Sequence, residues 1–388
     1  MSRKQNNTPI GLLADPFRPF FLGAALFALF AIPFWAWIFA ASPEGFAGFD
    51  AFSWHRHEMV FGYLAAVLAG FLFTAIPNWT GRLPLRGGGL GLLFLLWLAG
   101  RAMVAFWPLE VATAIVDCAF LVAIAGLAGR EIVAGRNWRN APICAVVSLL
   151  AFANILSWLP ATHDIGWRLA MGLVALLIGL VGGRVTPSFT RNWLAKRDSP
   201  RLPVPFGLYD KLCLLLLLAA VTGWSFAPES SIAGALLVLA GAAHLVRLGR
   251  WRGWLTVAEP LLLVLHVGYL WLVVALILMG LTALRVGPLD ASASLHALGA
   301  GAIGTMTVAV MSRAILGHTG RALVASPAMT LMFGAIVLSA LVRVLAPILP
   351  MPYDAAITVA AFLWACAYGL FVACFAVMLM TDDRALSS

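Results

Sequence analysis

The sequence predicts an all-α, multi-pass membrane protein with about 12 transmembrane helices. Of its 388 residues, 62% are hydrophobic and only 11% are charged, and the mean hydropathy is +0.97. No water-soluble domain buries that much apolar surface, so lipid must be the solvent. The apolar runs are about twenty residues long, which is the length that a helix needs to cross a bilayer. They are apolar on nearly every face, whereas the strands of a membrane barrel alternate.

Taken in order, these runs define a single integral membrane domain that comprises residues 1–388. Each run is separated from the next by a short segment rich in Pro, Gly or basic residues. The predicted helices lie near residues 18–41, 54–76, 88–107, 110–129, 141–160, 165–186, 210–227, 231–248, 258–282, 293–316, 327–348 and 355–380.

The distribution of basic residues predicts the orientation of the chain. With a cytoplasmic N-terminus, 20 of the 25 Lys and Arg residues fall in cytoplasmic loops, tails or helix ends; the five on the other side are Arg56, Arg101, Arg168, Arg285 and Arg343. This bias places both termini in the cytoplasm. It also accounts for the net charge of +9 without nucleic acid as a partner. The five cysteines lie inside apolar runs, so no disulfide framework is expected.

The second, sixth and tenth predicted helices end in similar sequences. Aligned on a threonine, Pro77 of the second matches Pro187 of the sixth, and Arg184 of the sixth matches Arg313 of the tenth. Because these helices are four apart, the echo favours three four-helix units. The alternative is that cytoplasmic helix ends simply favour Pro, Gly, Thr and Arg. The longest inner loop, predicted at residues 187–205, is basic and Pro-rich, which suits a connector.

Histidines border several of these helices. Histidine in or beside hydrocarbon is costly and usually functional, and neutral imidazole is a common ligand of haem iron and copper. His55, His57 and His296 begin the second and tenth helices on the outer side, whereas His318 ends the tenth helix inside. His296 and His318 are about 33 Å apart along one helix and cannot share a metal. We therefore predict an outer site between the second and tenth helices and a separate inner histidine locus.

The remaining histidines are placed by depth. His266 lies about two turns into the ninth helix and has His318 as its plausible partner, either as a metal ligand, as a proton relay or as a helix-to-helix hydrogen bond. His163 and His244 are assigned to a loop and to the lipid interface. Asp117 and Asn154 lie within helices without histidine neighbours, where interhelical hydrogen bonding accounts for them.

The spacing of His55 and His57 leaves the outer site open to two arrangements. Positions two apart on a helix point about 200° away from each other, so the two imidazoles serve different partners if both are helical. If the helix begins at His57, His55 folds back and both reach one site. Glu58 then orients an imidazole or relays protons. The alternative is an ion pair of Glu58 with Arg56 at headgroup level, while the histidines reach the interface.

The tenth helix continues from His296 with a run of small residues, Gly299, Gly301 and Gly304 among them. A small-residue face lets a neighbouring helix approach closely, and it equally lets a flat macrocycle lie against the backbone. Arg313, near the other end of this helix, pairs either with haem propionates or with anionic lipid headgroups.

Together these residues resemble the NnrS family of bacterial inner-membrane proteins, which are linked to the nitric oxide response. The resemblance rests on the motif of residues 16–21, on residues 54–62, on residues 266–269, and on the run from His296 to Arg321. It implies haem b and copper as cofactors and nitric oxide or a related small molecule as partner. It makes His55, His57, His266, His296 and His318 the metal-ligand candidates. Arg18 and Arg313 are further cofactor-binding candidates, and Glu58 and Met59 are expected to contact the ligands rather than the metal.

A weaker similarity is to the main subunit of haem-copper oxidases, which also has about twelve helices in three four-helix arcs. Here the sixth and seventh helices lack the histidines of that family, so a respiratory oxidase is not expected.

Three functions fit the sequence. The leading prediction is a haem- and copper-containing membrane protein that handles nitric oxide. The alternative is a proton-coupled secondary transporter of a small solute, in which histidines and Glu58 couple protons. Transporter sites more often use helices broken by Gly or Pro near mid-membrane, and no clear pair of these is evident. The third interpretation is a membrane regulator with no reaction of its own.

Overall fold

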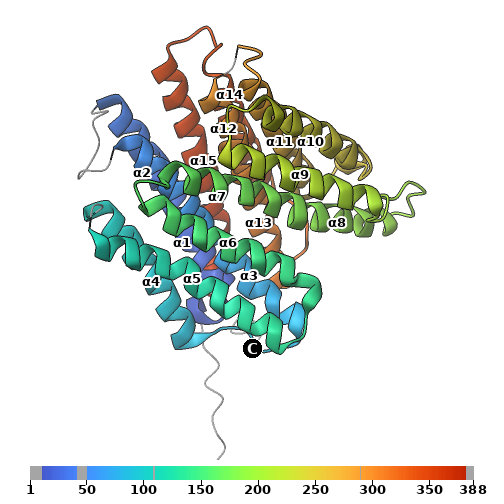
Figure 1. Cartoon of the computed structure of the whole chain (residues 1–388). Coiled ribbons are helices and arrows are strands. Elements are labelled where there is room, and N and C mark those ends of the chain that lie inside the picture. Colours follow the sequence, from blue (N-terminus) through green and yellow to red (C-terminus); the bar gives the residue numbers. More distant parts are fainter. Residues whose placement is uncertain (1–10, 42–49, 108–109, 289, 382–388) are drawn as a thin grey trace, which may run out of the picture.

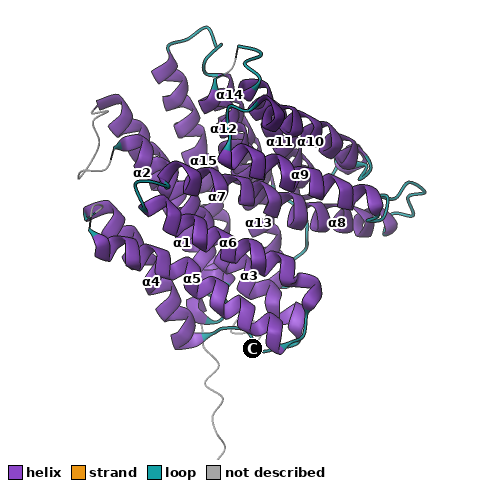
Figure 2. Ribbon diagram, viewed as in Figure 1, coloured by secondary structure: helices purple, strands orange, loops and turns teal. Residues whose placement is uncertain are grey.

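The structure is a computed structural model that describes residues 11–41, 50–107, 110–288 and 290–381. Within these residues every regular element is helical, as Figure 2 shows. Twelve helices in this part of the chain are long and apolar enough to cross a membrane, which confirms the prediction. The two termini, expected in the cytoplasm, lie outside the described residues.

Nine of the twelve described spans are single helices, and three are composite. The single ones are α1 (Phe17–Ala41), α4 (Gly87–Phe106), α5 (Val111–Ala134), α6 (Ala141–Trp158), α9 (Leu208–Phe226), α10 (Ser231–Gly249), α11 (Pro260–Ala283), α14 (Pro327–Leu345) and α15 (Tyr353–Met380). The composite ones are α2 (Ala51–His57), η2 (Glu58–Leu64) and α3 (Ala65–Thr80); α7 (His163–Leu177), η4 (Ile178–Gly182) and α8 (Gly183–Ala195); and α12 (Ala291–His296), η6 (Ala297–Gly304) and α13 (Thr305–His318). Short 3₁₀ turns, η1 (Gly11–Leu13), η3 (Trp138–Asn140) and η5 (Gly253–Thr256), precede α1, α6 and α11.

The composite helices are the second, sixth and tenth spans, and each contains a π-helical segment in its first half or at its centre: η2, η4 and η6. A π-helical turn is rare and wider than an α turn, and it often marks a functional region. Its recurrence at intervals of four helices supports the internal repeat that the sequence echo predicted. We call these three the central helices, because 78%, 67% and 72% of the residues in their most apolar stretches are buried. Among the described single helices only α11, at 67%, is comparable.

The other helices surround the central ones in chain order. α4 packs on α5, α5 on α6, α9 on α10 and α10 on α11, while α14 packs on α15 and α15 returns to α1 (Figure 1). The central helix formed by α2, η2 and α3 lies against α1 and α5. The one formed by α12, η6 and α13 lies against α11 and α14. Because the chain crosses the bundle twelve times, one end carries the starts of all three central helices. We call this the His55 end and the opposite one the Arg82 end.

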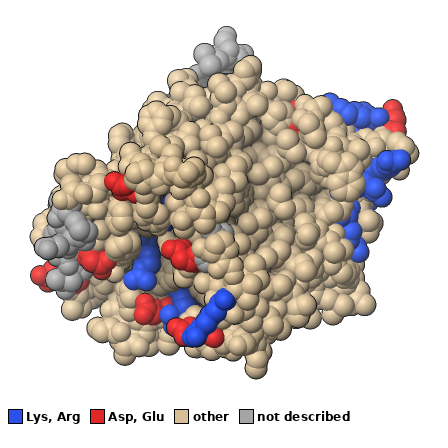
Figure 3. Space-filling view, turned by 90° about the horizontal axis from the view of Figure 1, so that it is seen from above, with Lys and Arg blue, Asp and Glu red and all other residues tan. Residues whose placement is uncertain are grey.

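The outer surface is apolar, as expected for a protein in lipid. Large side chains such as Phe30, Leu92 and Ile115 are each at least 65% exposed. In the space-filling view of Figure 3, charged side chains gather in a few places, and most of the surface is neither acidic nor basic.

One predicted boundary is wrong. The connector expected at residues 187–205 is helical as far as Ala195, and Pro187 lies inside α8. A proline removes its own N–H donor and disfavours an α conformation in the residue before it, but a buried helix whose freed carbonyl has other partners tolerates it. Pro77 lies inside α3 in the same way, and that helix ends at Gly81, whose φ of 70° is the left-handed cap that glycine favours.

Candidate functional site

The main candidate site is a cavity of about 480 Å³ at the His55 end, which we call the His55 cavity. Its wall is built from the three central helices together with α1, α14 and α15. Apolar side chains such as Met59, Trp35 and Ile303 cover most of it, and the basic side chains among them are His55, Arg56, His296 and Arg343. A cavity of this size and composition suits a ligand the size of a drug or cofactor.

His55 and His296 face each other across this cavity. Their ring centroids are 5.9 Å apart and the ring planes differ by 11°. His55 also stacks on Trp35, at a centroid distance of 4.4 Å, which fixes the orientation of its ring. His55 and His296, which come from the second and tenth spans, thus lie in the wall of the same cavity.

The hydrogen bonds of the two rings leave nitrogen atoms for a ligand. His296 Nδ1 lies 2.7 Å from the carbonyl oxygen of Ser292, and a carbonyl can only accept, so Nδ1 carries the proton. The lone pair of His296 is consequently on Nε2. His55 Nδ1 is buried and has no hydrogen-bond partner within the described chain. A buried polar atom without a partner is destabilising, and such atoms in native proteins usually await water, an ion or a ligand.

Other buried donors around the cavity also lack acceptors. Trp167 Nε1, Arg56 Nε, and Nε and Nη1 of Arg343 have no hydrogen-bond partner among the residues described. Arg343 is only 7% exposed and uses one nitrogen, Nη2, to bond Ser292 Oγ at 2.9 Å. The cavity thus collects N–H donors, two of them cationic, and a ligand with anionic or carbonyl acceptors would satisfy them.

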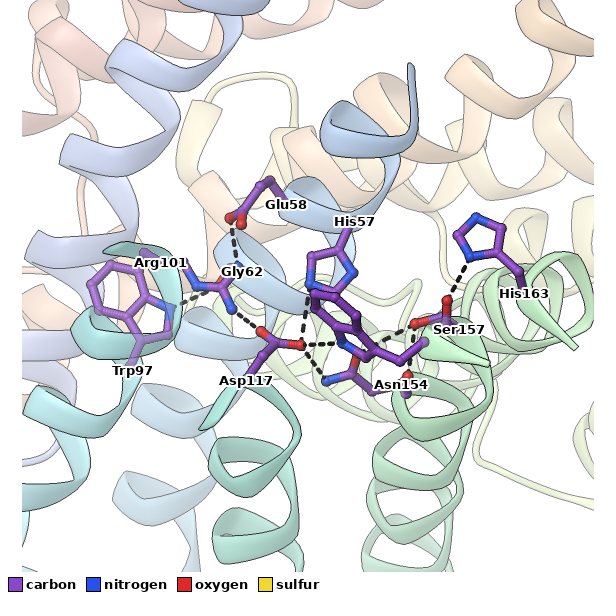
Figure 4. Close-up of polar contacts among 10 residues, drawn as sticks. His57, Glu58, Gly62, Trp97, Arg101, Asp117, Asn154, Ser157 and His163 are labelled. Atoms are coloured by element: carbon purple, nitrogen blue, oxygen red, sulfur yellow. Dashed lines mark hydrogen bonds and ion pairs between the residues drawn. The ribbon is translucent and has the colours of Figure 1, made fainter. Parts of the chain in front are cut away.

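His57 belongs to a different cluster, in which its ring faces Asp117 of α5 (Figure 4). Its Nε2 lies 3.1 Å from Asp117 Oδ2, and Asp117 also accepts from Asn154 and Trp158, each at 3.0 Å. The arrangement in which the two histidines serve different partners is the one that the structure adopts. The view that Asp117 has no histidine neighbour is wrong. His57 and Asp117 both lie near the His55 end of their helices, and this common depth was the sequence signal that could have identified the pair.

Arg101 extends this cluster to Glu58. Its guanidinium bonds Asp117 and donates to Glu58 Oε2 at 2.6 Å, and all three side chains are at least 93% buried. Trp97 Nε1 donates to the carbonyl of Gly62 at 3.0 Å beside it. The alternative ion pair of Arg56 with Glu58 is not formed, since the carboxylate nearest Arg56 is Asp164, at 3.8 Å. We call His57, Glu58, Arg101 and Asp117 the Arg101 network. It joins the central helix formed by α2, η2 and α3 to α4 and α5.

At the Arg82 end, the two inner histidines lie in different surroundings. His266 is buried, with Nε2 2.8 Å from Thr190 Oγ1 and its ring against Trp251. His318 is more exposed and lies 5.6 Å from the Phe17 ring, centroid to centroid. Within the described residues no group of three or more His, Cys, Asp and Glu side chains is arranged to hold a metal ion.

Two further placements concern buried polar groups. Arg18 does not line the His55 cavity: its Nη1 donates to the carbonyls of Met378, at 2.9 Å, and Thr381, at 2.6 Å, where α15 ends. His244 is fully buried and lies 2.7 Å from the hydroxyl of Tyr269, so its assignment to the lipid interface is wrong.

A second cavity, of about 340 Å³, lies at the Arg82 end and contains Arg313 and His318 in its wall. The guanidinium of Arg313 stacks on the Phe189 ring at 3.9 Å. We call this second cavity the Arg313 cavity.

The fold and these cavities define a multi-pass helical protein of the membrane type, with a histidine-lined cavity at one end of its central helices. The chain matches the sequence model of the NnrS protein family over residues 11–382, nearly its whole length, and it belongs to the NnrS family. No curated protein matches it. Membership fits a protein of the nitric oxide response and, more generally, a metal-binding family.

Proposed function

We propose that this protein binds haem b in the His55 cavity, between His55 and His296, and uses it to handle nitric oxide. The observation that carries the proposal is the facing pair of imidazoles. Two imidazoles that ligate one metal have ring centroids roughly 6 Å apart, because each metal–nitrogen bond is about 2.0–2.1 Å. The 5.9 Å separation of the two ring centroids matches this distance.

The donor set favours haem over a bare metal ion. A metal held by the protein alone generally takes three or more side-chain ligands, whereas a porphyrin supplies four nitrogens and needs only one or two from the protein. Two histidines line this cavity, and no larger metal-binding group occurs in the described part of the chain. Gly299 adds room: a Cβ built on it would meet nothing within 4 Å, so this part of the wall is open to a flat ligand.

Three polar residues of the cavity then have a role toward the cofactor. His296, held by Ser292, presents Nε2, and His55, held by Trp35, presents its unpartnered Nδ1. Arg343 has buried N–H groups that would pair with carboxylates such as the haem propionates. The apolar remainder of the wall excludes water. Bound haem would supply nitric oxide binding and one-electron chemistry.

The proposal is tested by absorption spectroscopy and metal analysis of the protein purified in detergent. We expect a Soret band that is lost or shifted in His55→Ala and in His296→Ala. His163→Ala is the matched control, since His163 is at the same end but bonds the Ser157 carbonyl outside the cavity. If both cavity variants keep the Soret band of the wild type, or if the wild type contains no haem, the proposal is refuted.

Copper is the second cofactor that the NnrS resemblance implies, and we propose the same two imidazoles as its ligands if it replaces haem. Metal analysis separates the two cases, because copper without iron would assign the site to copper. His57, His266 and His318 contact Asp117, Thr190 and Phe17, respectively. We therefore rank them below His55 and His296 as metal ligands.

Two cavities at opposite ends of the same three central helices favour the transporter as a second candidate. Secondary transporters carry substrate sites at repeat interfaces and open them alternately to either side. Colourless protein that carries out substrate-dependent proton flux in proteoliposomes would support this alternative.

We further propose that the protein lies in the bacterial inner membrane with the His55 end outside. The bias of basic residues toward the Arg82 end supports this orientation. Labelling of single cysteines introduced at exposed Leu83 and Phe106 would test it: a reagent that does not cross the membrane should reach only Phe106→Cys from outside.

A further inference from the structure

The Arg313 cavity lies where the three central helices meet at the Arg82 end. α3 contributes Thr74 and Asn78, α8 contributes Phe189, and α13 contributes Arg313 and His318. Asn78 and His318 are exposed, so the cavity opens toward the end of the bundle. It is separate from the His55 cavity and shares no wall residue with it.

The charge of this cavity is positive. No Asp or Glu is in its wall, and no carboxylate of the described chain lies within 4 Å of Arg313. The acid that acts on Arg313 from a distance, Glu259, has its Oε1 occupied by the backbone N–H groups of Leu261 and Ala325, each at 3.1 Å. Because Phe189 covers the face of the guanidinium, its N–H groups at the edge remain for an acceptor.

Three other polar groups of the wall are able to donate. Asn78 has an amide, Trp79 an indole N–H and His318 an imidazole. The hydroxyl of Thr74 already donates to the Gly70 carbonyl at 2.6 Å, which leaves its oxygen as an acceptor only. A wall with a cation and several donors selects a ligand with an anionic oxygen.

The volume and the apolar walls indicate what else the ligand contains. At about 340 Å³ the cavity is far larger than a bare inorganic oxyanion needs. Phe71, Val310 and Leu323 make much of the wall apolar. An apolar body attached to the oxyanion would fill this space and bury apolar surface.

We propose that the Arg313 cavity is a binding site for the oxyanion head of an amphiphile, a carboxylate or phosphate joined to an apolar body, which pairs with Arg313. The ligand comes either from solution, as a small organic acid, or from the bilayer, as an anionic phospholipid. The site assigns the inner histidine locus to anion binding rather than to a metal. It does not depend on haem in the His55 cavity.

The test compares benzoate with benzamide, which have the same shape but differ in charge. Binding is measured by scanning fluorimetry of the full-length protein in detergent, since a ligand of the folded state raises its Tm. We expect benzoate to raise the Tm of the wild type and benzamide not to. Arg313→Gln should weaken benzoate binding about tenfold or more, because a charge-assisted hydrogen bond is lost, and Arg313→Lys should be intermediate.

Two variants serve as controls for folding and for charge. Arg82→Gln removes a cation at the same end that is paired with Glu131, and it should leave benzoate binding unchanged. Gly317→Leu fills the cavity and should abolish binding without loss of folding, since a Cβ there meets only Leu323, at 3.8 Å. Equal effects of benzoate and benzamide, or full benzoate binding by both Arg313→Gln and Gly317→Leu, would overturn the proposal.

Native mass spectrometry of the same preparations distinguishes the two sources. Anionic phospholipid that is retained by the wild type and by Arg82→Gln, but is lost from Arg313→Gln, assigns the site to lipid, and benzoate should then displace it. Benzoate binding without retained lipid assigns it to a soluble acid. If the wild type neither retains anionic phospholipid nor binds benzoate, the proposed site is refuted.

Discussion

Arg101 offers the sharpest test of how the His55 end is held together. Its guanidinium lies between the carboxylates of Glu58 and Asp117, and it is only 7% exposed. Replacing it by methionine keeps much of the side-chain volume but leaves two buried carboxylates, with the imidazole of His57 as the nearest compensating group. Breaking a buried ion pair by removing one partner costs about 3–5 kcal/mol.

The exposed pair of Arg82 and Glu131 sets the scale for comparison. The Arg82 side chain is 46% exposed, and such pairs contribute about 0–1 kcal/mol. For a chain of this size, 1 kcal/mol corresponds to a change in Tm of about 1–2 °C, by the inverse dependence on chain length. Arg101→Met should therefore lower the Tm by roughly 3–10 °C and Arg82→Met by no more than about 2 °C. Scanning fluorimetry of the tryptophans in detergent measures both.

A double variant separates charge from packing. Glu58→Gln with Arg101→Met removes one carboxylate and the cation together, which leaves Asp117 paired with His57. We expect this protein to be several degrees more stable than Arg101→Met alone, because the uncompensated charge is gone. If the double variant is no more stable than Arg101→Met, the loss comes from packing, and the electrostatic account of the network is wrong.

Three further predictions concern the His55 cavity and Arg18. Gly299→Leu should abolish haem binding with little change in Tm, because a Cβ at this position meets open space. Gly301→Leu should lower the Tm, because a Cβ there would lie 2.6 Å from the Trp271 ring. Equal stability of the two proteins would contradict the assigned cavity wall. Arg343→Gln should accelerate haem loss to apomyoglobin about tenfold without removing the Soret band, and an unchanged rate would exclude its pairing with propionates. Arg18→Gln should speed hydrogen–deuterium exchange at the end of α15 and leave the haem spectrum unchanged, since Arg18 bonds the carbonyls of Met378 and Thr381; a changed spectrum would restore it as a cofactor-binding residue.

The sequence was sufficient for the number of helices and for the common end of His55 and His296. Hydropathy depends on residue type alone, and a chain that crosses twelve times brings the starts of the second and tenth helices to the same side. The recurrence of similar residues in the second, sixth and tenth helices also predicted an internal relationship, and η2, η4 and η6 now support it. What the sequence could not supply was the π-helical form of these segments, because a shift of one residue in hydrogen bonding has no clear residue signature.

The burial of charged residues also required the tertiary structure. Arg101 and Arg343 were counted as outer basic residues, and both are only 7% exposed. Composition predicts on which side of the membrane an arginine lies, but its depth depends on carboxylates and hydroxyls that other helices bring to it. For Arg101 these are on the second helix and α5, and for Arg343 the partner is Ser292 of α12.

The separation of His55 from His57 shows most directly where each kind of information ends. Helical spacing alone predicts that residues two apart face in nearly opposite directions. It does not determine what lies in either direction, because that depends on which helices pack on each side. The tertiary structure places His296 and Arg343 beside the cavity that His55 faces, and Asp117 beside His57. One imidazole thereby faces a ligand cavity, whereas the other is held by a buried carboxylate.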